Sequence, residues 1–133
     1  MVQRYRADLG IPSGMHRDEL GAFGEHTART YLEARGFTTL HANWRIRHLE
    51  LDLVCTHGGQ LVVVEVKTRE TAHFGEPWEF FTRSQRRNII RAADAYIHRY
   101  EIDLPVRFDV VSVVHNRYGT RTTHFPDAFY PML

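Results

Sequence analysis

One short run, LVVVEVKTRE at residues 61–70, constrains the fold of this chain more than any other segment. Its apolar, β-branched beginning is typical of a strand buried inside a sheet. Side chains alternate between the two faces of a strand, so Glu65 and Lys67 point to one side while Val64 and Val66 point to the other. Because desolvating an unpaired charge costs roughly several kcal/mol, either the end of this strand is solvated or the two charges have a function.

The size and composition of the chain fit one globular domain. It has 133 residues, of which 43% are hydrophobic and 25% charged, with a formal net charge of +1. This length can bury a core, and the balanced charge does not by itself indicate a nucleic-acid-binding protein. A single cysteine, Cys55, excludes an internal disulfide and a CxxC metal site. No apolar run is long enough to span a membrane and no signal peptide is recognisable, so we expect a cytoplasmic protein without a membrane partner.

The remaining patterns predict helices alternating with a sheet. We expect a flexible N-terminal arm over 1–18 and a single domain over 19–133. An apolar stripe predicts a helix over 20–35 that Gly36 ends, and a second helix from a Thr82 cap to about Tyr100. The predicted strands or extended segments are 37–43, 50–56, 60–68, 106–115 and 120–126, with a loop over 70–80. This order predicts an α/β or α+β sandwich.

Acidic residues gather on the predicted hairpin over 50–67. By the period-two rule Glu50 and Asp52 share a side of the first strand, as Glu65 and Lys67 do on the second. If the strands pair, three carboxylates and one ammonium lie near one sheet edge, but the sequence does not specify the register that decides this. Clustered carboxylates repel unless a cation lies among them, and Mg²⁺ prefers such oxygen ligands. The set favours metal-assisted phosphodiester hydrolysis, whereas the competing interpretation is a solvated ion-pair face that contributes little stability.

The order Asp52, Glu65, Lys67 resembles the signature of the PD-(D/E)xK nucleases. The chain as a whole more closely resembles the YraN-like family of bacterial proteins, and the resemblance covers roughly residues 20–129. It rests on the segments GAFGEHTARTYLEARGF, NWRIRHLELDLV, LVVVEVKTR, FGEPWEF, RFDVV and DAF. This resemblance implies an α/β fold with a restriction-endonuclease-like core, in which helices flank a central mixed β-sheet.

The resemblance also implies a role for each matching residue. Asp52 and Glu65 would bind Mg²⁺ or Mn²⁺, with the carbonyl of Val66 as a further ligand. Lys67 would be the catalytic lysine. The family is similar to archaeal Holliday-junction resolvases, which place a glutamate on the first helix beside the metal site. Glu25 occupies that position, where it would be an additional ligand or a second-metal residue; without the family it would be a helix-surface carboxylate.

Three further positions bear on the resemblance. Gln85, near the start of the second predicted helix, would help to order the site or the substrate. The family usually has a glycine where Leu49 stands, and a leucine does not easily adopt positive φ. A lysine that the family usually carries near Ser84 is missing, which weakens the expected contact with phosphate.

Basic residues flank the acidic hairpin on both sides. Arg83, Arg87 and Arg91 recur at i, i+4 and i+8, on one face of the second predicted helix. Arg45 and Arg47 precede the acidic strand, and Arg69 follows Lys67. Any one of them is most simply a solvated surface residue. Together they predict contacts with a nucleic-acid backbone, which hold phosphates rather than read bases.

The sequence therefore predicts a metal-dependent nuclease acting on DNA, including branched repair or recombination intermediates. One alternative is a non-catalytic nucleic-acid-binding module with the same fold, and another is an interaction protein with an acidic ion-pair face. An exposed edge over 120–126 would suit a homodimer. Asp109 is expected to be structural, paired with Arg107 or a loop amide, and Cys55 to be a buried small side chain.

Overall fold

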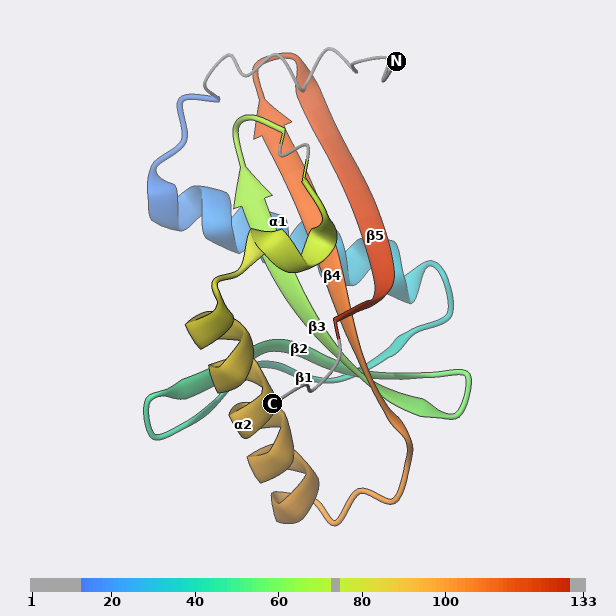
Figure 1. The fold of residues 1–133 in the computed structure, drawn as a ribbon. Coiled ribbons are helices and arrows are strands. Elements are labelled where there is room, and N and C mark those ends of the chain that lie inside the picture. The colour runs from blue at the N-terminus through green and yellow to red at the C-terminus, as the bar shows by residue number, and fades with distance from the viewer. Residues whose placement is uncertain (1–12, 73–74, 130–133) are drawn as a thin grey trace.

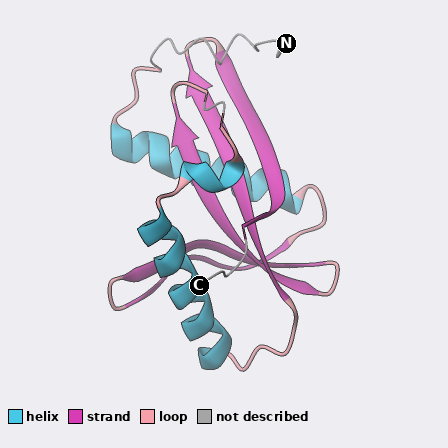
Figure 2. Cartoon of the chain, in the orientation of Figure 1, coloured by secondary structure: helices cyan, strands magenta, loops and turns pink. Residues whose placement is uncertain are grey.

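The fold is a twisted sheet with a helix against each face, shown in Figure 1 as a computed structural model. The structure describes residues 13–72 and 75–129. Figure 2 separates the helices from the strands in the same orientation. In chain order the elements are α1 (Arg17–Glu33), β1 (Thr38–Ile46), β2 (Leu49–His57), β3 (Gln60–Arg69), η2 (Pro77–Phe80), α2 (Arg83–Arg99), β4 (Val106–Asn116) and β5 (Gly119–Phe129).

The five strands form one mixed sheet in the order β1-β2-β3-β4-β5. β3 and β4 are parallel, and the other neighbouring pairs are antiparallel. A parallel pair needs a crossover connection, which α2 supplies between β3 and β4. The predicted α/β fold with a central mixed sheet flanked by helices is confirmed, and it is consistent with a restriction-endonuclease-like core.

The valine run is buried on both faces, which is why it reads as continuously apolar. Val62 and Val64 pack against Ala28 and Leu32 in a cluster on the α1 side of the sheet, which we call the α1 cluster. Leu61 and Val63 pack against Ile89 and Ala93 on the opposite side, in the α2 cluster. Cys55 is buried in the α1 cluster, as expected of a small apolar side chain.

Both helices follow the predicted boundaries closely. α1 begins at Arg17 rather than at residue 20, so Arg17 and Asp18 belong to a helix and not to the expected arm. Asp18 and Glu19 in its first turn favour this start because they lie at the positive end of the helix dipole. Residues 1–12 of the expected arm, and 73–74 of the expected loop, lie outside the described residues.

No helix within the described residues is both long enough and apolar enough to cross a membrane.

A fully buried carboxylate, Asp109, joins β4 to β5. Its Oδ1 accepts hydrogen bonds from Arg107 Nε at 2.8 Å and from the Asp127 amide at 2.9 Å. Its Oδ2 accepts from Arg107 at 2.8 Å and meets His124 Nε2 at 2.7 Å. Burial acts to raise the pKa of Asp109, but the hydrogen bonds from His124 and Arg107 outweigh it and hold that pKa below its ordinary value. The predicted pairing of Asp109 with Arg107 is confirmed, whereas the backbone amide that it binds belongs to strand β5 and not to a loop.

Close packing of α1 on β3 depends on Gly24. A Cβ atom at this position would overlap Thr68 Oγ1 and lie 2.7 Å from Thr68 Cγ2. The absent side chain lets the helix approach the strand, and the next residue along the helix is Glu25. The position of Glu25 over the sheet is therefore a consequence of this contact.

We predict that Gly24→Ala lowers the free energy of unfolding by about 1–3 kcal/mol, because the added methyl group forces α1 away from β3. Gly21→Ala is the matched control: its new Cβ would meet no atom within 4 Å. The control should gain about 0.5–1 kcal/mol from helix propensity. Urea denaturation of both variants measures the difference, and equal midpoints would show that Gly24 does not set the helix position.

Candidate active site

Asp52 and Glu65 lie where β2 separates from β3. The backbone ladder between these strands ends at the pair Leu53 and Val64. Beyond it, the Asp52 amide donates to Glu65 Oε2 at 3.0 Å, and the Val66 amide donates to Asp52 Oδ2 at 2.8 Å. Each carboxylate thus accepts a hydrogen bond from a backbone amide of the other strand. In a continuing ladder, a backbone carbonyl would accept that hydrogen bond instead. We call these two residues the carboxylate pair; the sheet holds it in place rather than a loop.

β2 changes direction at Asp52. Leu51 packs in the α2 cluster while Leu53 packs in the α1 cluster, so regular alternation of faces fails between them. Asn43, which lies between the β1 partners of Leu51 and Leu53, has a φ of 51°. Asparagine tolerates this left-handed conformation better than most residues, so it accommodates the bend. Figure 1 shows the result: β1 and β2 run across the lower part of β3, β4 and β5.

The environment of the carboxylate pair opposes two negative charges. Burial raises the pKa of Asp52 to about 7, and Glu25 and Glu50 add to this effect. Burial, followed by repulsion from Asp52, raises the pKa of Glu65 well above its ordinary value. The other oxygens of the pair, Asp52 Oδ1 and Glu65 Oε1, accept no hydrogen bond from the described residues. The pair therefore needs a proton or a cation to be stable near neutral pH.

This donor set suits a hard divalent cation. Mg²⁺ is bound by oxygen atoms, often from one or two carboxylates, and keeps several water molecules. The two uncommitted oxygens fit this requirement. No group of three or more His, Cys, Asp or Glu side chains among the described residues is assembled to hold a metal ion. Glu25 is thus not part of a closed ligand set, and its role as a ligand stays a prediction.

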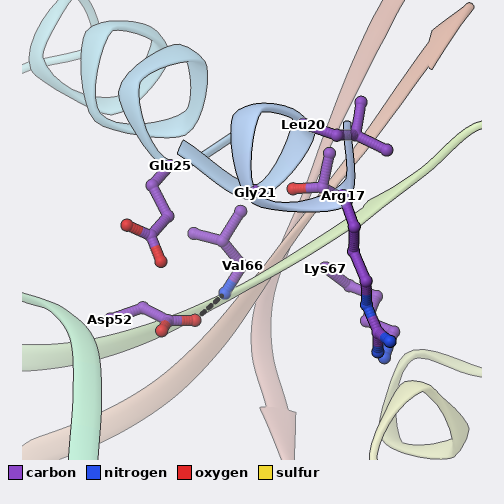
Figure 3. Close-up of a pocket in the computed structure, with 8 residues that line it drawn as sticks. Arg17, Leu20, Gly21, Glu25, Asp52, Val66 and Lys67 are labelled. Atoms are coloured by element: carbon purple, nitrogen blue, oxygen red, sulfur yellow. Dashed lines mark hydrogen bonds between the residues drawn. The ribbon is translucent and has the colours of Figure 1, made fainter. Parts of the chain in front are cut away.

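A pocket of about 250 Å³ opens beside Asp52, between α1 and β3. Its walls are Arg17, Leu20, Gly21, Glu25, Asp52, Val66, Lys67 and Thr68. Figure 3 shows the Glu25 side chain extending from α1 toward Asp52, whose carboxylate is turned to the Val66 amide, with the Arg17 side chain running beside Lys67. The structure thus brings Glu25, Asp52, Val66 and Lys67 together, as the sequence predicts, with Glu65 joined to Asp52 behind them.

Arg17 is the pocket residue that the sequence analysis missed. It fell within the predicted arm, whereas it is the first residue of α1. Its spacing from Gly21 and Glu25, at i, i+4 and i+8, places all three on one helix face. The spacing of these three residues would have predicted that Arg17 shares a face with Glu25. It applies only if the helix begins one turn before the first residue of its apolar stripe.

Lys67 extends the pocket toward η2. Its Nζ lies 5.8 Å from the centroid of the Phe81 ring. Burial lowers the pKa of Lys67, and the positive charges of Arg69 and Arg17 lower it further, while Asp52 has the opposite effect. A lysine whose pKa is reduced in this way exchanges a proton more readily near neutral pH than an ordinary lysine does.

The arginines predicted on α2 lie outside this pocket. Arg83, Arg87 and Arg91 are exposed on the helix surface. Arg83 stands two residues after Phe81, whose ring faces Lys67, so the start of α2 is the part of this row nearest the site. Their contact with nucleic acid stays a prediction.

Gln85 has a structural task at the same end of α2. Its Oε1 accepts a hydrogen bond from the Thr82 amide at 2.7 Å, and its own amide donates to Thr82 Oγ1 at 3.1 Å. This capping box confirms Thr82 as the helix cap. A part for Gln85 in ordering a substrate stays a prediction.

The other predicted arginines lie around the hairpin. Arg45 pairs with the exposed Glu50 at 3.5 Å, and Arg47 forms the β1–β2 turn with a φ of 54°. Arg69 lies over the Phe80 ring, with 5.3 Å from its Cζ to the centroid. The residue with positive φ in this turn is Arg47, so Leu49 does not have to adopt that conformation. Leu49 instead packs against the α2 cluster, which explains how a leucine fits where the family usually has glycine.

Fold and site together define a class: an α/β protein whose mixed sheet holds one buried and one half-buried carboxylate beside a pocket with a lysine. A family model described as "Uncharacterised protein family UPF0102" matches residues 24–113. The chain belongs to this family, which is the YraN family, so the predicted resemblance is confirmed.

Several relatives carry the name UPF0102 protein. One from Bacteroides thetaiotaomicron is 44% identical over 116 residues, which is 87% of this chain and 96% of the relative. One from Phocaeicola vulgatus is 40% identical, covering 86% of this chain and 94% of the relative. One from Christiangramia forsetii is 36% identical, covering 85% and 95% respectively. The similarity therefore extends over nearly the whole of each relative.

We predict that in EDTA the stability of the protein falls by about 1–3 kcal/mol between pH 5 and pH 8. The pKa of Asp52 rises from an ordinary 3.8 to about 7 on folding, so the folded chain holds a proton in this window that the unfolded chain has lost. The loss should continue through pH 7, because half of the Asp52 protons remain there and the pKa of Glu65 is raised as well. Urea unfolding at stepped pH measures it, and Asp52→Asn should flatten the profile.

The control for this prediction is Glu50→Gln, which removes an exposed carboxylate from the same strand. This variant should keep most of the wild-type pH dependence. Mg²⁺ or Mn²⁺ should restore wild-type stability at pH 8 but have little effect on Asp52→Asn. A wild-type profile no steeper than that of Asp52→Asn would contradict the raised pKa.

Proposed function

We propose that this protein is a metal-dependent nuclease that hydrolyses phosphodiester bonds in DNA, and that it acts in the cytoplasm on branched repair or recombination intermediates. The observation that supports this proposal most strongly is the carboxylate pair. Glu65 is buried and Asp52 is half-buried, and each has one oxygen that is not hydrogen-bonded within the described residues. Asp52 lines a pocket that also contains Lys67.

Each residue has a distinct task in this proposal. Asp52 and Glu65 would hold Mg²⁺ or Mn²⁺, with the Val66 carbonyl and Glu25 as further ligands. A divalent cation, when bound, supplies Lewis acidity and neutralises charge on the phosphate. Lys67 would orient the attacking water and stabilise negative charge that develops on the phosphate. Its lowered pKa supports a part in proton transfer as well.

The basic surface supports a polyanionic substrate. Arg83, Arg87 and Arg91 form an exposed row that begins close to Lys67, and Arg69 lies on the same strand as Lys67. Such residues bind the phosphate backbone of any sequence, so we expect selectivity for strand structure rather than for bases. β5 is an edge strand of the sheet, and its open backbone would suit pairing with a second copy of the chain.

We predict metal-dependent cutting in a panel of single-stranded, duplex, flapped and four-way-junction DNA with Mg²⁺ or Mn²⁺. Asp52→Asn should reduce the rate at least about a hundredfold, the scale expected when a group that stabilises the transition state is removed. Asparagine retains an oxygen to accept from the Val66 amide, so the variant should fold.

Glu50→Gln, purified in parallel, is the control, because it removes a carboxylate of the same strand that is exposed and paired with Arg45. Its activity should stay within about twofold of wild type, as for a surface ion pair of little energetic weight. Cutting that survives in Asp52→Asn would exclude the proposed site. DNA binding without cutting by the wild type would favour the non-catalytic binding module.

A second prediction concerns the α2 surface. Changing Arg83, Arg87 and Arg91 together to alanine should weaken DNA binding. It should also reduce the slope of log affinity against log salt by about 2–3, because each lost phosphate contact lowers that slope by about 0.9. Arg29 and Arg35, changed together, are a control in and just after α1, which packs on the opposite face of the sheet from α2. Fluorescence anisotropy over a range of KCl concentrations gives both slopes, and an unchanged slope in the triple variant would rule out this surface.

A further inference from the structure

We propose that Arg17, Lys67 and Arg69 form a subsite that binds a phosphate group of one nucleic-acid strand, next to the carboxylate pair. The inference rests on the proposed function and names the part of the substrate that this site holds. It adds Arg17, which lies before residues 24–113, the part of the chain that the family model matches.

The three cations of this phosphate subsite are not neutralised by protein carboxylates. No ion pair joins Arg17, Lys67 or Arg69 to an acidic residue within the described residues. Arg17 and Lys67 line the same pocket, and Arg69 follows Lys67 by two residues on β3, so the three positive charges lie near one another. Gathering like charges without a counter-ion costs free energy, which an anionic ligand would recover.

The acidic residues nearest in sequence do not fill this role. Asp18 and Glu19 share the first turn of α1 with Arg17, but neither lines the pocket. Glu70 follows Arg69, and its Oε2 accepts a hydrogen bond from the Ser13 amide at 3.1 Å. Arg17 and Lys67 therefore bring positive charge to the pocket itself, and Arg69 adds to it from the next position on the same side of β3.

Arg17 is the first residue of α1, and it lines the pocket together with Lys67. Arg17 is exposed, and Figure 3 shows its side chain running past Lys67 and away from Glu25 and Asp52. The pocket thus has an acidic end and a basic end.

Aromatic rings hold the basic end in position. Lys67 Nζ lies 5.8 Å from the Phe81 ring centroid, and Arg69 Cζ lies 5.3 Å from that of Phe80. Cations within about 6 Å of a ring face are attracted to it, so both side chains are ordered before a ligand arrives. Arg86 fixes the ring segment by donating to the carbonyl of Phe81 at 2.7 Å.

The pocket is too small to enclose a base pair, and its two cations favour a phosphate over an uncharged base. The pocket volume of about 250 Å³ is below the roughly 300–1,000 Å³ of sites that enclose whole drug-sized ligands. A phosphate with part of its sugar fits in such a space, whereas a base pair does not. A guanidinium binds phosphate in a bidentate manner, so Arg17 can fix the orientation of the strand as well as its charge.

The test uses Arg17→Gln and a fluorescein-labelled single-stranded 20-nucleotide DNA probe in EDTA, where metal-dependent cutting cannot interfere. Affinity should fall roughly fivefold to tenfold, and the slope of log affinity against log salt should decrease by about 0.7, as expected for one phosphate contact to a single strand. Arg17→Lys retains the charge and should keep the wild-type slope.

Arg29→Gln is the matched control, because it removes the same charge from the same helix outside the pocket, where Arg29 only pairs with Glu33 at 3.2 Å. Its affinity should stay within about twofold of wild type. Arg17 is exposed, so unfolding temperatures should be the same for all variants.

The outcomes separate this inference from the proposed nuclease activity. Equal affinity and slope for Arg17→Gln and Arg29→Gln, or no binding of the probe by wild type, would overturn the phosphate subsite even if the protein cuts DNA. A selective loss in Arg17→Gln would support the subsite even if the wild type cuts nothing in Mg²⁺ or Mn²⁺, in which case only the nuclease proposal fails.

Discussion

The separation of β2 from β3 at Asp52 is the constraint on which the candidate site depends. Where the backbone ladder stops, an amide of each strand donates a hydrogen bond to a carboxylate of the other strand. These hydrogen bonds commit one oxygen of Asp52 and one of Glu65 and leave the second oxygen of each without a donor in the described residues. Burial raises both pKa values, and repulsion from Glu25 adds to it at Asp52 as repulsion from Asp52 does at Glu65. The geometry that completes the sheet therefore leaves a site that is stable only with a proton or a cation.

The two faces of the sheet contribute different parts of the site. On one face, Gly24 allows α1 to lie against β3, which places Glu25 opposite Asp52 and Arg17 beside Lys67. On the other side of Lys67, the segment that leads into α2 supplies the Phe81 ring. The pocket is therefore built on packed elements rather than on long loops, an arrangement that holds functional groups in fixed positions before a ligand binds.

Much of this could be predicted from the sequence because its signals are local. The valine run, the hairpin over 50–67 and the Thr82 cap each specify their own element, and Asp109 has a partner only two residues away. The hydrogen bonds of Asp52 could not be predicted, because they arise where Leu51 and Leu53 pack against different helices. Arg17 was missed since an apolar stripe marks where a helix is buried, not where its first exposed turn begins.

The most direct test of the central claim is a crystal structure of the protein grown with Mn²⁺ at about pH 8 and measured at the manganese absorption edge. The account predicts an anomalous peak in contact with Asp52 Oδ1 and Glu65 Oε1, the two oxygens that lack donors. Absence of that peak at saturating Mn²⁺, with the two carboxylates sharing a proton instead, would show that the pair is a neutral structural contact and not a metal site.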